Sequence, residues 1–199
     1  NHSILSDTSQ AIKFALFGQP DVPLQRSQVE NLAYATIRAK MGRSGRVLMV
    51  LGRYDGPDLH WISADYVALV TRSGRLVKSA GLPDNLKNTE FPNGDPLETG
   101  LNFLTETVFV DRIVDFEFEN NYGVTINSQI EPAGQETIHI LDRDYTANIY
   151  RELNAAKSID WEFVNYFWVD PATGFVWKSR QHLTPSLPPV EIEILKPAG

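Results

Sequence analysis

The chain has 199 residues, 42% of them hydrophobic, which is enough to bury the core of one domain. Its 25 acidic residues outnumber its 18 lysines and arginines, so the formal net charge of −7 argues against a nucleic-acid partner or an anionic membrane surface. No apolar run reaches the ~18 residues of a transmembrane helix. The absence of cysteine excludes disulfides, thiolate metal sites and cysteine nucleophiles within these residues.

Two amphipathic helices are predicted at the start of the chain, over residues 6–17 and 28–41. Gly18 and Pro20 end the first. The second begins at a capping box of Ser27 and Glu30, and Gly42 stands where a C-terminal cap belongs. The apolar stripe of this second helix consists of Val29, Leu32, Ala33 and Ile37.

From residue 46 onward the apolar period changes from 3.6 to 2, which predicts a β domain of about ten strands. The expected strands are residues 46–54, 59–64, 66–71, 76–79, 106–119, 123–131, 137–141, 146–152, 161–169, 175–182 and 190–195. Residues 81–100, rich in proline, glycine and asparagine, are expected to form a long loop. Loops of this length are usually functional or mobile, so this one is the expected contact surface.

The most strongly marked element is a β-hairpin within residues 159–182. Its turn, Asp170-Pro171-Ala172-Thr173-Gly174, has a proline-set bend closed by a glycine that is free to take positive φ. Both faces of the first arm are apolar, with Trp161, Phe163, Phe167 and Val169 on one and Val164, Tyr166 and Trp168 on the other. A strand that is apolar on both faces is usually covered on both, so the hairpin is expected in the middle of a sheet.

These elements predict a mainly β fold of one domain spanning residues 1–199. The short connections favour a large curved antiparallel sheet, as a partial barrel or a sandwich. The two N-terminal helices precede it, and helix 28–41 is expected to pack on its concave side.

Candidate catalytic and metal-binding patterns are weak. Asp115, Glu117 and Glu119 share one strand face, as a pair of glycosidase carboxylates could, but an alternating strand with a wet face produces the same pattern. The four histidines are scattered singly, and no nucleophile-elbow, phosphate-loop or dinucleotide motif is present. We therefore expect no catalytic residues, no metal site and no cofactor.

The second arm of the hairpin supplies the candidate contact residues. Aromatic rings beside polar side chains can stack on sugar rings and hydrogen-bond their hydroxyls. Alternatively, Trp177 belongs to the core, with Lys178 and Arg180 facing water, as is usual for strand tryptophans. The candidates for contact with a glycan or a partner are Trp168, Trp177, Arg180 and Gln181.

Two blocks of the chain resemble a known family. FWVDPATGFVWKSRQHLTPSLPPVEIEILKP (167–197) and DYVALVTRSGRLVKSAGLPDNL (65–86) are similar to the YjbF/GfcB family of group 4 capsule polysaccharide lipoproteins. The resemblance implies a predominantly β fold without catalytic residues. It also implies an exported lipoprotein of the outer membrane, on the periplasmic side, anchored through an acylated cysteine that would precede Asn1 after removal of a signal peptide.

The leading hypothesis is a non-enzymatic periplasmic domain that assists capsule or exopolysaccharide assembly or export. Its partners would be proteins of the export machinery and possibly the polysaccharide, with membrane attachment only through the lipid anchor. Two alternatives are a lipid or lipoprotein carrier, with Trp161, Phe163 and Phe167 lining an apolar cavity, and a glycan-modifying enzyme that uses the strand carboxylates.

Overall fold

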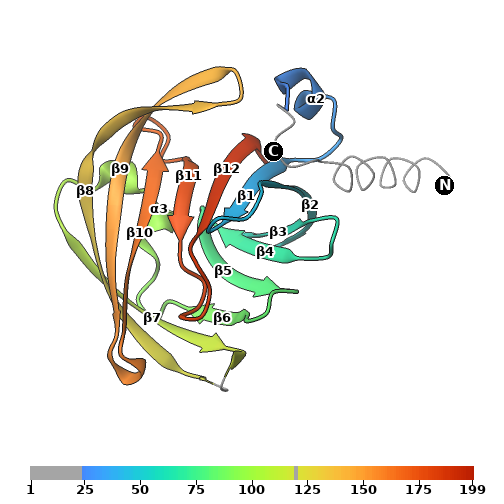
Figure 1. The fold of residues 1–199 in the computed structure, drawn as a ribbon. Helices are drawn as coiled ribbons and strands as arrows, with labels where there is room; N and C mark the ends of the chain where they lie inside the picture. Colours follow the sequence, from blue (N-terminus) through green and yellow to red (C-terminus); the bar gives the residue numbers. More distant parts are fainter. Residues whose placement is uncertain (1–23, 119–120) are drawn as a thin grey trace.

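The computed structural model describes residues 24–118 and 121–199, so the expected helix 6–17 lies outside the described residues. The described chain forms one antiparallel sheet of 12 strands in the order β5-β4-β3-β2-β1-β12-β11-β10-β9-β8-β7-β6, which curls into a nearly closed barrel-like shape (Figure 1). Its strands are β1 (Thr36–Met41), β2 (Val47–Asp55), β3 (Asp58–Ile62), β4 (Ala68–Arg72), β5 (Arg75–Ala80), β6 (Leu86–Glu90), β7 (Val108–Phe116), β8 (Val124–Ile140), β9 (Arg143–Ala156), β10 (Trp161–Val169), β11 (Val176–Gln181) and β12 (Val190–Lys196).

Most expected strands and the mainly β, antiparallel architecture are confirmed. The β10–β11 hairpin lies in the interior of the sheet between β9 and β12, with Phe167 opposite Ser179. The expected strands 123–131 and 137–141 are halves of the 17-residue strand β8, which continues through an irregularity between Pro132 and Gly134. The β8–β9 hairpin is therefore long enough to extend beyond the rest of the sheet and curl back toward the N-terminal part of the chain (Figure 1).

The predicted helix 28–41 is wrong. A helix of five residues, α2 (Arg26–Glu30), is followed by strand β1, which pairs with β2 on one side and β12 on the other. The β-branched Thr36 and Ile37 fit a strand better than a helix. Pairing with a neighbouring strand on each side stabilises this segment more than burial of one apolar helix face would. Val29 packs with Leu195 of β12, whereas Ile192 and Ile194 on the alternate parity face the interior. Thus α2 covers the outer face of the sheet rather than its concave side.

Residues 81–100 are more regular than the sequence predicted, because they contain strand β6 and helix α3 (Pro96–Thr99). A 3-10 turn, η1 (Leu101–Phe103), follows directly. Proline at the first position of α3 is compatible with a helix start, and Asp95 caps it. The proline and glycine content that predicted a loop marks the ends of these short elements.

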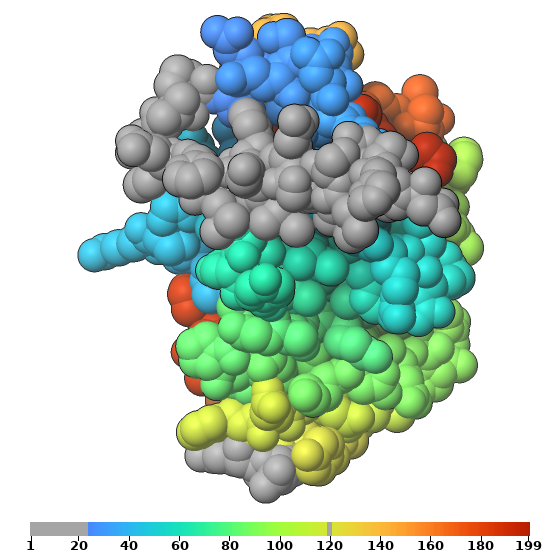
Figure 2. All heavy atoms as spheres, turned by 90° about the vertical axis from the view of Figure 1, so that its right-hand side faces the viewer, coloured from blue at the N-terminus to red at the C-terminus, as the bar shows by residue number. Residues whose placement is uncertain are grey.

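Side chains close the barrel-like sheet where β5 meets β6. The Thr89 hydroxyl donates to the Val77 carbonyl at 2.9 Å, and the Leu86 amide donates to the Ser79 hydroxyl at 3.0 Å. In Figure 2, which faces this side, the residues of β2 to β6 follow one another down the surface, in colours from cyan to green. The two end strands of the sheet are thus joined without a backbone ladder.

The interior is filled by side chains of the strands. Phe163 stacks on Trp161 with ring centroids 3.8 Å apart, and Trp161 meets Phe116 edge to face at 5.8 Å. A second cluster around the fully buried Phe167 includes Leu97 and Leu101 from the α3–η1 segment. These residues, rather than an N-terminal helix, occupy the concave side. In the described part of the chain, no helix is long and apolar enough to cross a membrane.

Candidate functional site

A cavity of about 430 Å³ opens at the end of the barrel-like sheet where several turns meet, and we refer to it as the mouth cavity. Its floor carries apolar side chains of the sheet, among them Trp61, Ile192 and Ile194. Its rim comes from the β4–β5 turn, the α3–η1 segment and the β10–β11 turn, which bring Ser73, Thr99, Asn102, Thr173, Phe175 and Trp177 together. An apolar floor with a few polar groups at the rim, in this range of volume, is typical of a small-molecule site.

The β10–β11 turn holds its part of the rim through Asp170. The Asp170 carboxylate accepts hydrogen bonds from the backbone amides of Ala172 and Thr173 at 2.9 and 2.8 Å. Burial raises the pKa of this carboxyl, but these bonds and the one from the Thr173 hydroxyl outweigh it and lower the pKa below its usual value. Gly174 closes the turn at φ +76°, as the sequence predicted.

Two glycines make room for the side chain of Asn102 beneath the rim. A Cβ atom at Gly174 would lie 2.5 Å from Asn102 Oδ1, and one at Gly100 would lie 2.7 Å from it. Both glycines have positive φ, a conformation that an L-residue seldom adopts. The hairpin turn and the α3–η1 segment are therefore in close contact.

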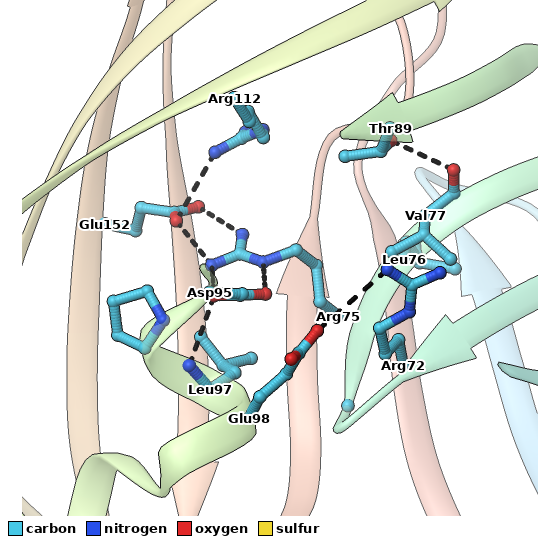
Figure 3. Close-up of polar contacts among 12 residues, drawn as sticks. Arg72, Arg75, Leu76, Val77, Thr89, Asp95, Leu97, Glu98, Arg112 and Glu152 are labelled. Carbon is cyan, nitrogen blue, oxygen red and sulfur yellow. Dashed lines mark hydrogen bonds and ion pairs between the residues drawn. The ribbon is translucent and has the colours of Figure 1, made fainter. Parts of the chain in front are cut away.

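A buried ion pair anchors the α3–η1 segment inside the sheet (Figure 3). Asp95 accepts from the Leu97 amide at the start of α3 and from Arg75 Nε and Nη2, at 2.5 and 3.0 Å. Arg75 also reaches Glu152 of β9, with Nη2 2.8 Å from Oε1. The Arg75 and Asp95 side chains are 2% and 1% exposed, so this contact is shielded from water.

Glu152 lies between two guanidinium groups. Arg112 Nη1 is 3.4 Å from Glu152 Oε1, and Asn165 donates to Oε2 at 2.7 Å. Burial raises the pKa of Glu152, but Arg75 and Arg112 outweigh it and lower the pKa to about 2. Burial lowers the pKa of Arg112 to about 10, Glu152 opposing this and Arg75 reinforcing it. The carboxylate and both guanidinium groups are thus charged at neutral pH.

The polar residues of this network were not among the candidates that the sequence indicated. Glu152 and Asn154 share the parity of buried Tyr150 and Ala156 in β9, and Asn165 stands between Phe163 and Phe167 in β10. Polar residues on a strand face that is otherwise apolar indicate a buried polar network. On a buried face such side chains need hydrogen-bond or ion-pair partners inside the protein, because they have no contact with water. The identity of their partners could not be predicted, because Arg75, Asp95 and Arg112 come from distant elements.

The four candidate contact residues are divided among three environments. Trp177 borders the mouth cavity, but its side chain also packs, with Tyr145, against the outer-face cluster that contains Val29 and Leu195. The centroid of its ring lies 4.2 Å from that of Tyr145 and 4.6 Å from that of Phe175. Trp168 is half-buried outside the cavity, donates its indole N–H to Glu136 and carries Lys178 above its ring at 5.0 Å. Arg180 is exposed, opposite Tyr166.

Gln181 lies in the interior and is 2% exposed. Its side-chain carbonyl accepts from the Leu76 amide at 3.0 Å, and its amide nitrogen donates to the Gly74 carbonyl at 2.8 Å. These bonds hold the β4–β5 turn against β11. The structure therefore brings only Trp177 to the mouth cavity.

The residues behind the two alternative hypotheses do not form the sites that those hypotheses require. Asp115 accepts from the Gly123 amide and Glu117 from the Asn85 side chain, both at the sheet surface, and Glu119 lies outside the described residues. Phe163 and Phe167 are 7% and 0% exposed and do not line the mouth cavity. Within the described ranges no group of three or more histidine, aspartate or glutamate side chains could hold a metal ion.

Taken together, these features define a barrel-like antiparallel β protein with a filled interior, an internal charge network and a cavity at one end. The family model for the group 4 capsule polysaccharide lipoproteins GfcB and YjbF matches residues 9–195. The chain therefore belongs to that family, which confirms the resemblance seen in the sequence.

Known relatives and a solved structure agree with this assignment. The chain is 33% identical to the uncharacterized lipoprotein GfcB of Escherichia coli K12, over 92% of this chain and 86% of the relative. It is 24% identical to the uncharacterized lipoprotein YjbF of the same organism, over 92% and 85%. The crystal structure of the hypothetical lipoprotein YmcC from E. coli K12 has a TM-score of 0.83 and 31% identity, covering 100% of this chain and 98% of that one.

Proposed function

We propose that this protein is the non-enzymatic periplasmic domain of an outer-membrane lipoprotein. It assists the assembly or export of a capsule or exopolysaccharide, and it contacts the glycan at the mouth cavity. The family supports the lipoprotein and capsule parts of this proposal. The observation that carries the contact is the position of Trp177 and Phe175 at the rim of an apolar cavity.

The lining of the mouth cavity fits a sugar ring. The apolar faces of pyranose rings pack against aromatic side chains, and their hydroxyls exchange hydrogen bonds with hydroxyl and amide groups. Phe175 and Trp177 supply the first kind of contact, and Thr99 and Thr173 supply the second. Asp170 makes five hydrogen bonds within the turn that carries Thr173 and Phe175, so the rim is ordered before a ligand arrives.

Proteins of the export machinery are the second part of the proposal, and the outer face of the hairpin is the proposed contact for them. Arg180 and half-buried Tyr166 and Trp168 lie there, outside the lining of the mouth cavity. Aromatic and arginine side chains of this kind are enriched at protein interfaces. A partner could therefore bind while the cavity holds a glycan.

The test is a titration of the tryptophan fluorescence with oligosaccharides prepared from the polysaccharide that the host cells export. We expect a saturable change that Trp177→Ala abolishes and Trp168→Ala keeps, with both variants folded by circular dichroism. Trp168 is a matched control because it lies on the same hairpin but outside the cavity. The reverse pattern would move the site to the outer face, and no response from either variant or the wild type would contradict glycan binding.

The apolar floor of the mouth cavity favours a second candidate, a carrier for an acyl chain. Leu59, Trp61, Ile192 and Ile194 could surround a hydrocarbon as well as the face of a sugar. Native mass spectrometry of the purified protein would detect a bound lipid. A copurifying lipid that is displaced by a fatty acid but not by an oligosaccharide would favour the carrier.

A further inference from the structure

A second cavity, of about 460 Å³, lies on the other side of the η1 turn, and we call it the β7 cavity. It is bordered by residues 93–95 before α3, by Pro96 at the start of α3, and by residues 108–111 at the start of β7. The two cavities share Thr99, Gly100 and Phe103 in their linings. Only the α3–η1 segment therefore separates them, with Phe103 in the lining of both.

Phenylalanine rings stand along the two cavities in unusually exposed positions. Phe103 is 79% exposed on the ridge between the cavities, and Phe109 is 78% exposed in the β7 cavity. Phe175 is 36% exposed in the mouth cavity. Large apolar side chains gathered in this way mark a binding surface rather than a random surface composition.

The fold holds Phe103 in the exposed position. Leu97 and Leu101 on the same segment are 5% and 1% exposed and fill the interior beneath it. The Leu104 amide donates to the Leu101 carbonyl at 2.9 Å, and Asp95 fixes the start of α3 through the buried Arg75. Because the segment is anchored on its inner side, the Phe103 ring cannot turn inward without displacing those leucines.

The two cavities carry almost no formal charge. Of the charged residues that line them, Asp95 is buried against Arg75, and only Glu98, Lys178 and Asp111 remain at the surface. Two carboxylates and one ammonium group give no excess of positive charge that would attract a polyanion. The lack of excess positive charge and the exposed phenylalanine rings therefore favour an uncharged ligand with apolar faces.

We propose that the two cavities form one groove for an internal, uncharged stretch of a linear polysaccharide, with Phe103 stacking on a sugar ring midway between Phe175 and Phe109. This inference rests on the proposed function and adds the length, the charge and the mode of binding of the ligand. A groove that is open along two cavities holds the middle of a chain, whereas a closed pocket would hold only its end. Successive rings of the polymer lie over successive aromatic side chains, so affinity grows with the number of residues bound.

The experiment uses neutral fragments of the exported polysaccharide, separated by size and freed of acidic fragments by anion exchange. Calorimetric titration of the full chain is expected to give a Kd that falls at least about tenfold between fragments of about two and about six residues. Phe103→Ala is expected to remove most of that gain while leaving the affinity for the shortest fragments within about twofold. Phe109→Ala tests the far cavity separately in the same way.

The matched control is Phe118→Ala. Phe118 is also an exposed phenylalanine, at 55%, but it follows the opposite end of β7 and lines neither cavity. Equal Kd values for short and long fragments, or full length dependence in Phe103→Ala, would overturn the groove while leaving glycan binding at the mouth cavity intact. Tighter binding of the acidic fraction would overturn the charge assignment. Binding of no fragment at any length would overturn the proposed function as well.

Discussion

Replacing Glu152 by glutamine would leave the guanidinium groups of Arg75 and Arg112 in the interior with Asp95 as the remaining carboxylate near them. Removing one partner of a buried ion pair costs roughly 3–5 kcal/mol, because the other charge stays desolvated. The lowered pKa of Glu152 gives a similar value for the stability that this carboxylate contributes. A carboxyl at about 2 in the folded state and 4.5 in the unfolded state contributes about 3 kcal/mol to stability at neutral pH. We expect Glu152→Gln to lower the free energy of unfolding by about 3 kcal/mol.

The assay is urea denaturation at pH 7 and at pH 3, followed by fluorescence. Because the folded-state pKa is the lower one, the contribution of Glu152 is complete above about pH 5 and disappears as the pH falls toward 2. The difference between wild type and Glu152→Gln should thus shrink to roughly half or less at pH 3. Glu131→Gln, which removes the partner of Arg151 on the sheet surface, is the control and should change little. Equal effects of the two variants, or a difference that does not shrink in acid, would refute this account.

Two further variants test the frame of the site, beside Trp177→Ala and Phe103→Ala above. Gly174→Ala should lower stability by about 1–2 kcal/mol in thermal unfolding, since it combines positive φ with a clash against Asn102. Gly94→Ala has positive φ without a neighbour within 4 Å, so it should cost less, and an equal loss would contradict the clash. Val29→Ala should speed hydrogen exchange at the β8–β9 tip, because buried Val29 packs on Ile138 and Ile140, while β10 should keep its protection. Unchanged exchange at the tip would contradict the role of α2.

The strands could be predicted because their signals are local. Alternation along β10 and the Asp170–Gly174 turn chemistry located the hairpin, and the structure places it in the interior of the sheet as expected. The prediction of helix 28–41 was wrong because the deciding contacts are not local. Its apolar spacing is compatible with a helix, and only the pairing of β1 with β2 and β12 decides for a strand.

The site was less predictable than the fold. Trp177 was among the candidates, because aromatic residues beside polar ones can be recognised in one strand. Phe103 and Phe109 were not singled out, since their exposure depends on how the α3–η1 segment and the start of β7 lie in the tertiary structure. Gln181 was grouped with Trp177 and Arg180 as a contact residue. Its position in β11 places its side chain on the interior face of the sheet, where it binds the β4–β5 turn.

The positions of most strands and of the hairpin turn are thus determined by residues close together in the chain. The family could be recognised from such local blocks as well. The tertiary structure alone decided what fills the barrel-like sheet and where it opens. Arg75, Asp95, Arg112 and Glu152 are far apart in sequence, and only the closure of the sheet brings β5, α3, β7 and β9 to one point. Buried charges require such partners, so their meeting is a property of the whole fold rather than of any segment.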